Sequence, residues 1–105
     1  MAVGGPHRLE VKSLGGREVW LLEPTADIHD QWEAFQEWAR GRDDAPWRAK
    51  LASLLLCDEK GVPLFTAADV PKLGKMSAAV LTEIGKAGLK LLAVTDSEVE
   101  AAAGN

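Results

Sequence analysis

The residues that most often carry out chemistry in proteins are sparse in this chain. It has two histidines, His7 and His29, and one cysteine, Cys57. The histidines are far apart in the sequence, and neither lies at ligand spacing from the cysteine. A structural zinc ion usually takes four such ligands and a catalytic one takes three. The sequence therefore predicts no metal site.

Cys57 is the one candidate nucleophile. An activated cysteine needs a base or an electropositive setting that favours its thiolate. Cys57 instead follows three leucines and precedes Asp58 and Glu59, which should raise the pKa of its thiol. We expect a small buried side chain. Because no nucleophile, base and oxyanion donor occur together, we predict no enzyme and no cofactor.

Two short segments match ligand-binding loops only in part. Asp58-Glu59-Lys60-Gly61 begins like a calcium loop, but the later acidic positions and the closing glutamate are missing. Gly74-Lys75-Met76 ends like a phosphate-binding loop, but it lacks the upstream glycine and has methionine where serine or threonine is required. We interpret the first segment as a solvated turn with Gly61 at positive φ, and we reject the second.

Composition and charge limit the class of partner. The 105 residues form one domain, 1–105, with 47% hydrophobic residues and a net charge of −4. Nucleic-acid binders usually carry a basic surplus, and the second helix of a helix-turn-helix over 67–93 would offer DNA only Lys86 and Lys90. No apolar run approaches the roughly 20 residues that span a bilayer. We predict a cytoplasmic protein with no nucleic-acid and no membrane partner, and the single cysteine fits a reducing compartment.

The hydrophobic pattern predicts a mainly α domain of four to five helices with a short N-terminal β-hairpin. Residues 1–7 should be a flexible terminus, 8–22 the hairpin and 24–103 the helical part. The first helix starts at the cap Thr25 and buries Ile28, Trp32 and Phe35. Its other face is acidic, whereas residues 46–94 carry seven basic side chains against four acidic ones. Such opposite fields favour packing within the chain or head-to-tail association between copies.

The most apolar stretch, residues 47–74, should organise the core. We expect a helix from about Trp47 to Leu56, a reversal at Gly61 and a short helix that Thr66 and Asp69 cap. A long helix should then run from about Ser77 to Ala93. The capping box Thr95-Asp96-Ser97-Glu98 should open a separate last helix.

Five residues are candidates for contacts with a client or a second copy. Gly85 and Gly88 each cost up to about 1 kcal/mol relative to alanine inside a helix, and close approach of another helix, from this chain or a second copy, explains that cost. Trp20 and Trp38 lie off the predicted core faces, and tryptophan is enriched in interface hot spots. With Leu92, these residues form the predicted interface: Trp20, Trp38, Gly85, Gly88, Leu92.

The order of these segments resembles tail assembly chaperones of long-tailed phages and prophages. The resemblance covers about residues 19–105 and rests on pattern, not on catalytic motifs. It is carried by Val19-Trp20-Leu21 before Pro24-Thr25, the run Leu55-Leu56-Cys57-Asp58-Glu59-Lys60-Gly61-Val62-Pro63-Leu64-Phe65-Thr66, Asp69-Val70 with Leu73, the helix from Ser77-Ala78-Ala79-Val80-Leu81, and the close Thr95-Asp96-Ser97-Glu98-Val99-Glu100 before Gly104-Asn105.

The resemblance implies a function in assembly. Such chaperones coat the tape measure protein in the host cytoplasm before the tail tube polymerises, work without ATP, and are absent from the finished virion. Members often self-associate, so a homo-oligomer is expected, and some also recruit the tail tube protein. The alternative from the residues alone is a generic helical adaptor, such as a head–tail joining or regulatory protein.

Overall fold

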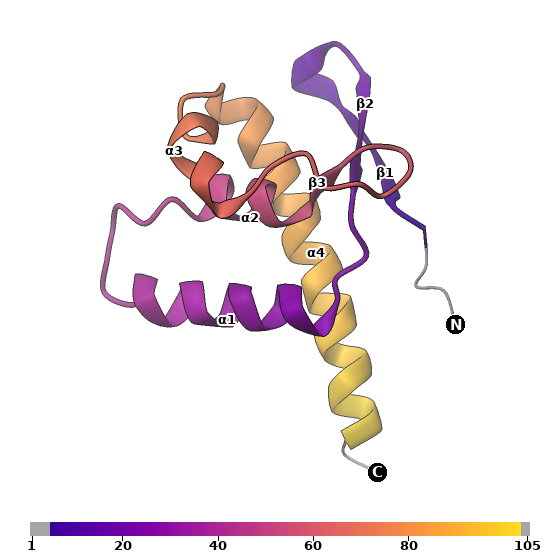
Figure 1. Ribbon diagram of the computed structural model, residues 1–105, viewed down its shortest axis with the longest axis vertical. Coiled ribbons are helices and arrows are strands. Elements are labelled where there is room, and N and C mark those ends of the chain that lie inside the picture. Colours follow the sequence, from indigo (N-terminus) through magenta and orange to yellow (C-terminus); the bar gives the residue numbers. More distant parts are fainter. Residues whose placement is uncertain (1–4, 104–105) are drawn as a thin grey trace.

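The computed structural model describes the backbone of residues 5–103 and the side chains of residues 5–93. This part of the chain forms four α-helices, two short 3₁₀ helices and a three-stranded sheet (Figure 1). The mainly helical domain is confirmed, and the sheet has one strand more than the predicted hairpin. The predicted flexible terminus lies partly outside the described residues, and its last residue, His7, is the first residue of a strand.

The N-terminal hairpin pairs β1 (His7–Val11) with β2 (Arg17–Leu21) in antiparallel register, with Leu9 opposite Val19. Val11 and Leu21 are fully buried, and Leu9 packs against the same core. A 3₁₀ helix, η1 (Lys12–Leu14), forms the tip. The alternation of apolar and charged residues thus directs one face of the hairpin toward the helices, as an isolated hairpin requires for stability.

A carboxylate from the last helix holds the hairpin tip. Glu83 accepts hydrogen bonds from the backbone N–H groups of Lys12, at 2.8 Å, and of Ser13, at 2.9 Å, and also from the Ser13 hydroxyl. These bonds, first of all the one from the Ser13 hydroxyl, lower the pKa of Glu83 below its ordinary value. Glu83 therefore joins segments that are about 70 residues apart in the sequence.

We expect Glu83→Gln to lower the midpoint of thermal unfolding at pH 7, because a neutral amide accepts these hydrogen bonds more weakly than a carboxylate. The pKa of Glu83 is lower in the folded than in the unfolded chain. The contribution of Glu83 to the stability of the fold is therefore complete at pH values above its pKa in the unfolded chain. It is lost as the pH falls through the pKa of Glu83 in the folded chain.

Scanning calorimetry from pH 7 down to pH 3 checks this prediction. The difference between wild type and Glu83→Gln should shrink below the ordinary glutamate pKa of 4.5. Glu33→Gln, an exposed change on the first helix, is the matched control. A wild-type advantage that persists undiminished at pH 3 would contradict the assigned role.

The first helix, α1 (Ala26–Ala39), begins as predicted. Thr25 is its N-cap, and the Thr25 hydroxyl accepts a hydrogen bond from the Ile28 N–H at 3.3 Å. Ile28 and Trp32 are buried, and the Phe35 ring stacks on Trp32 with 5.4 Å between ring centroids. The side of α1 that carries Ile28, Trp32 and Phe35 is therefore its core side.

The second helix, α2 (Trp47–Leu55), ends one residue earlier than predicted. Leu56 and Cys57 leave the helix and form a two-residue strand, β3 (Leu56–Cys57), against β2. The helix was therefore predicted within one residue, but the strand that follows it was not predicted. Pairing with β2 ends the helix at Leu55, because the Leu22 N–H donates to the Leu55 carbonyl at 2.7 Å and extends the sheet ladder to the end of α2.

The reversal and the short helix follow the prediction. Gly61 has φ of +84°, in the left-handed region that glycine adopts without strain. A 3₁₀ helix, η2 (Ala67–Asp69), then leads into α3 (Val70–Leu73). The Asp69 carboxylate accepts from the Thr66 N–H at 2.8 Å, as expected of the capping pair.

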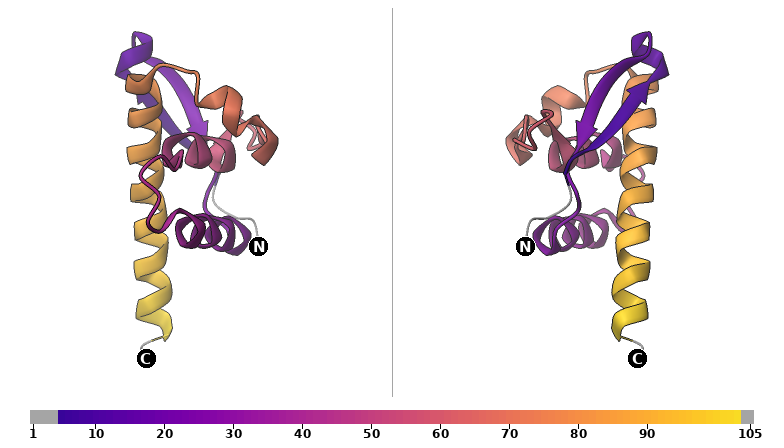
Figure 2. Two further views of the ribbon diagram at one scale, coloured as in Figure 1. Left: turned by 90° about the vertical axis from the view of Figure 1, so that its left-hand side faces the viewer. Right: turned by 90° about the vertical axis from the view of Figure 1, so that its right-hand side faces the viewer.

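The last helix, α4 (Ala78–Ala103), stands along one side of the molecule, and α1 and α2 both lie on the same side of it (Figure 2). Its two glycines face α2. A Cβ at Gly85 would lie 2.9 Å from Cζ3 of Trp47, and one at Gly88 would lie 2.8 Å from Cδ1 of Leu55. The helix that approaches Gly85 and Gly88 closely is therefore α2 of the same chain.

The predicted separate helix from Thr95 was wrong, because α4 runs through that position without a break. A capping box contributes only about 1 kcal/mol per cap. The segment after Gly88 has no proline and no further glycine before position 104 that would interrupt a helix. The backbone hydrogen bonds of α4 therefore continue past Thr95, because they stabilise the chain more than a new cap at Thr95 would.

Candidate functional site

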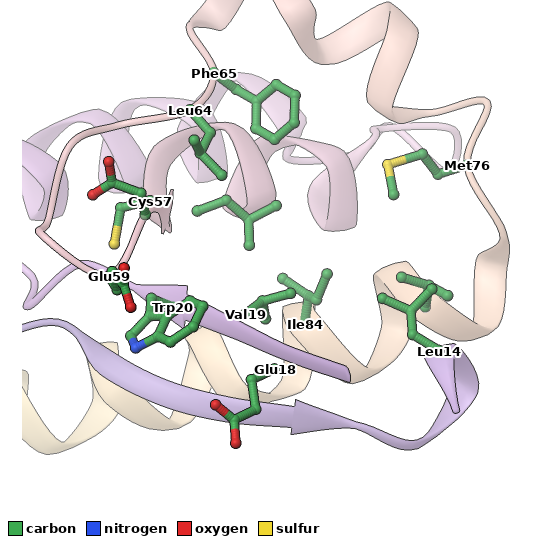
Figure 3. Close-up of a pocket in the computed structure, with 13 residues that line it drawn as sticks. Leu14, Glu18, Val19, Trp20, Cys57, Glu59, Leu64, Phe65, Met76 and Ile84 are labelled. Atoms are coloured by element: carbon green, nitrogen blue, oxygen red, sulfur yellow. The ribbon is translucent and has the colours of Figure 1, made fainter. Parts of the chain in front are cut away.

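An apolar groove of about 510 Å³ lies between the hairpin, the reversal after β3 and the start of α4 (Figure 3). Thirteen residues line it, from the hairpin, β3 and the reversal, the loop before α4, and α4. They are Leu14, Glu18, Val19, Trp20, Leu56, Cys57, Asp58, Glu59, Leu64, Phe65, Met76, Val80 and Ile84. Its size and largely apolar lining are typical of a binding site.

The reversal places one wall of the groove. The Asp58 carboxylate accepts hydrogen bonds from the N–H groups of Lys60, at 2.8 Å, and Val62, at 2.9 Å. These contacts turn the chain back, and the Leu64 N–H then donates to the Leu56 carbonyl at 3.1 Å. The sequence Asp58–Gly61 is therefore a structural turn that fixes where Leu64 and Phe65 stand.

The floor of the groove is buried and its rim is exposed. Val80 and Ile84 of α4 are 3% and 2% exposed, so the floor belongs to the core. Leu64 at the rim is 55% exposed and Met76 is 40% exposed. The groove therefore has a buried apolar floor and exposed apolar side chains at its rim.

All the charged residues of the lining are acidic. Glu18, Asp58 and Glu59 lie at the groove, and no lysine or arginine lines it. The hydrogen bond from the Val62 N–H is the main reason that the pKa of Asp58 lies below its ordinary value, so this carboxylate is ionised at neutral pH. Glu18 also pairs with Arg8 at 3.3 Å, on the outer side of the hairpin. The groove therefore presents an apolar floor with a negative rim.

Cys57 is 1% exposed and lies in β3. Burial raises the pKa of its thiol, and the neighbouring Asp58 raises it further. Both effects favour the protonated form, which is not the nucleophile. Cys57 is thus a buried apolar residue, as expected, and it forms part of the groove wall.

The structure separates the five predicted interface residues. Trp20 lines the groove. Trp38 is 52% exposed on α1, where the Arg42 guanidinium lies 4.6 Å from its ring centroid, and it does not line the groove. Gly85, Gly88 and Leu92 are buried in this chain, and the two glycines pack against Trp47 and Leu55 of α2.

Sequence reasoning missed most of the groove, above all Leu64 and Met76. A hint was present in Val62-Pro63-Leu64-Phe65, where apolar residues follow a polar turn without the period of a helix. Their exposure depends on how the reversal packs against β3, which the local pattern does not contain. Met76 comes from a different loop and reaches the groove only through the tertiary fold.

Within the described residues, no three histidine, cysteine, aspartate or glutamate side chains gather where they could hold a metal ion. In the same part of the chain, no helix combines the length and the apolar character needed to cross a membrane. No family model, curated protein or solved structure matches this sequence.

Proposed function

We propose that this chain is a tail assembly chaperone of a long-tailed phage or prophage, and that its groove binds an apolar segment of the tape measure protein. The chaperone acts in the host cytoplasm without ATP and leaves before the virion is complete. The observation that carries the proposal is the open apolar groove between the hairpin and α4, with Leu64 and Met76 exposed at its rim. A protein that coats an apolar client needs such a surface and no catalytic group.

The groove also connects the geometry to the resemblance. Residues 55–66, the run that carries the resemblance most fully, include β3, the Asp58 turn and Leu64 with Phe65. This run therefore builds one wall of the groove. A segment with a binding role is a simpler explanation for exposed apolar side chains there than a segment that only reverses the chain.

We expect Leu64→Asp to weaken binding of the tape measure protein by about ten- to a hundredfold. Burying a leucine contributes about 1.5–3 kcal/mol, and each 1.4 kcal/mol changes affinity tenfold. The measurement is co-expression of the two proteins, an affinity pull-down, and titration of the purified components.

Val62→Asp is the matched control. Val62 is also 55% exposed and lies two residues away in the same segment, but it does not line the groove. It should bind the client like wild type. Equal losses in both variants would show a general charge effect and would remove the groove from the proposal.

The wild-type pull-down separates the proposed function from the adaptor. A soluble complex with several copies of the chain per tape measure protein supports the chaperone. An insoluble client beside unbound chain, or stable retention in finished particles, supports an adaptor such as a head–tail joining protein.

Trp38→Ala belongs in the same experiment, because Trp38 is exposed and, unlike Trp20, lies outside the groove. If α1 forms contacts between copies or with the client, this variant lowers the number of copies in the complex while Leu64→Asp lowers client affinity. A variant that leaves both quantities unchanged would remove Trp38 from the interface.

A further inference from the structure

The groove is bordered by an edge of β2. Glu18, Val19 and Trp20 are consecutive residues of this strand, and all three line the groove. Successive side chains of a strand point to opposite faces of the sheet, so a cavity on one face alone would not contact three consecutive residues. A cavity that contacts all of them lies at the edge of the strand. β1 occupies the other edge, and Figure 3 shows β2 between β1 and the cavity.

The main chain of Glu18 faces this edge. Trp20 pairs with Cys57, and the Leu22 N–H donates to the Leu55 carbonyl, so alternate residues at this end of β2 direct their main-chain groups toward β3. The same alternation directs the N–H and C=O of Glu18 to that edge. β3 ends at Cys57, and in the described part of the chain no strand continues the pairing beyond Trp20.

An unpaired strand edge discriminates between two kinds of occupant. A helix satisfies its backbone groups internally, so a helix lying over the groove would cover the N–H and C=O of Glu18 without bonding them. An extended segment would bond both groups and place every second side chain on the floor formed by Val80 and Ile84. The geometry therefore favours an extended occupant.

The charge of the groove specifies the occupant further. The lining includes Glu18, Asp58 and Glu59 and no cation. Arg8 pairs with Glu18 on the outer side of the hairpin, and the charge of Lys60 acts on Asp58, so the negative charge of the rim is offset in part. Electrostatic complementarity then favours a segment whose apolar side chains alternate with polar ones and which has a lysine or arginine near the Asp58 turn.

We propose that the groove binds its client by strand addition, as an extended apolar segment with a basic residue that pairs with the Glu18 edge of β2. The identity of the client rests on the proposed function. The added strand continues the edge of β2 at the point where β3 stops, beside Trp20.

The test uses the full chain and overlapping 15-residue synthetic peptides that cover the tape measure protein. The tightest-binding peptide is then made with a single N-methyl group at each position in turn. We expect affinity to fall about tenfold at the one position whose N–H donates to the Glu18 carbonyl, because that N–H is worth about one hydrogen bond, and to change little at the two adjacent positions. In a helical peptide, N-methyl groups at several consecutive positions would interrupt the helix and lower affinity together.

Two variants at Glu18 test the contact between the peptide and β2 by changing the protein instead of the peptide. Glu18→Pro removes the N–H at the groove edge, and proline is tolerated at a strand edge. It should weaken the peptide about tenfold relative to Glu18→Gln, which keeps the backbone and removes the charge. Circular dichroism and thermal unfolding confirm that both variants are folded.

The outcomes separate the two proposals. Binding of no peptide would overturn both the client assignment and the strand addition. Peptide binding with uniform or absent N-methyl effects, and equal affinities for Glu18→Pro and Glu18→Gln, would overturn strand addition and leave the chaperone function in place.

Discussion

Leu51→Ala is expected to lower the free energy of unfolding by about 2–5 kcal/mol, the range for truncating a leucine in a packed core. Leu51 is fully buried on α2 and belongs to the core cluster between α2 and α4. The substitution removes apolar contacts and leaves a cavity that neighbouring helices fill only in part. For a domain of this size total stability is typically about 5–15 kcal/mol, so the loss is a large share of it.

Chemical denaturation followed by tryptophan fluorescence measures this effect. Leu64→Ala is the matched control, because it truncates the same side chain where 55% of the residue is exposed. Its effect should stay within about 0.5 kcal/mol. Similar losses for the two variants would contradict the placement of Leu51 at the centre of the core.

Gly88→Val is expected to lower the free energy of unfolding by about 1–3 kcal/mol, the usual cost of overpacking. A Cβ at this position would lie 2.8 Å from Cδ1 of Leu55 and 3.8 Å from Cδ2 of Leu51. Both leucines are buried, so the valine methyl groups must displace α2 or force these side chains out of favourable rotamers.

Lys86→Val is the control for helix propensity, because it places the same residue two positions earlier on an exposed part of α4. It should change stability by less than about 0.5 kcal/mol. A double-mutant cycle of Gly88→Ala with Leu55→Ala adds a direct test of the contact. Alanine at position 88 should be less costly, or favourable, once the Leu55 methyl groups are gone. Full additivity would show that the contact does not limit the residue at position 88.

The elements that the sequence predicted best are those with strong local determinants. Thr25 ahead of Ile28 and Trp32 gives α1 both a cap and an apolar face, and the structure has both. Asp58 accepts from the Lys60 N–H, and Gly61 takes the positive φ that the reversal needs without strain. In each case residues within a few positions of one another supply the hydrogen bonds or the periodicity.

The errors occurred where distant residues compete with a local preference. Leu56 fits a helix by pattern, but pairing with Leu21 makes it a strand residue. Thr95 fits a helix cap, but α4 continues past it. Pairing in a sheet and continuation of an existing helix both add hydrogen bonds that a local motif does not outweigh.

The sequence by itself determined the helical class, the hairpin, the capped starts of α1 and η2, and the burial of Cys57, because these depend on neighbours in the chain. Only the tertiary structure decided that Gly85 and Gly88 serve the contact between α2 and α4, and that Trp20 joins Leu64 and Met76 around one groove. The groove needs segments from the hairpin, the reversal, the loop before α4 and α4 itself. Their side chains meet because the core packs the hairpin and α2 against α4, and no local pattern encodes that arrangement.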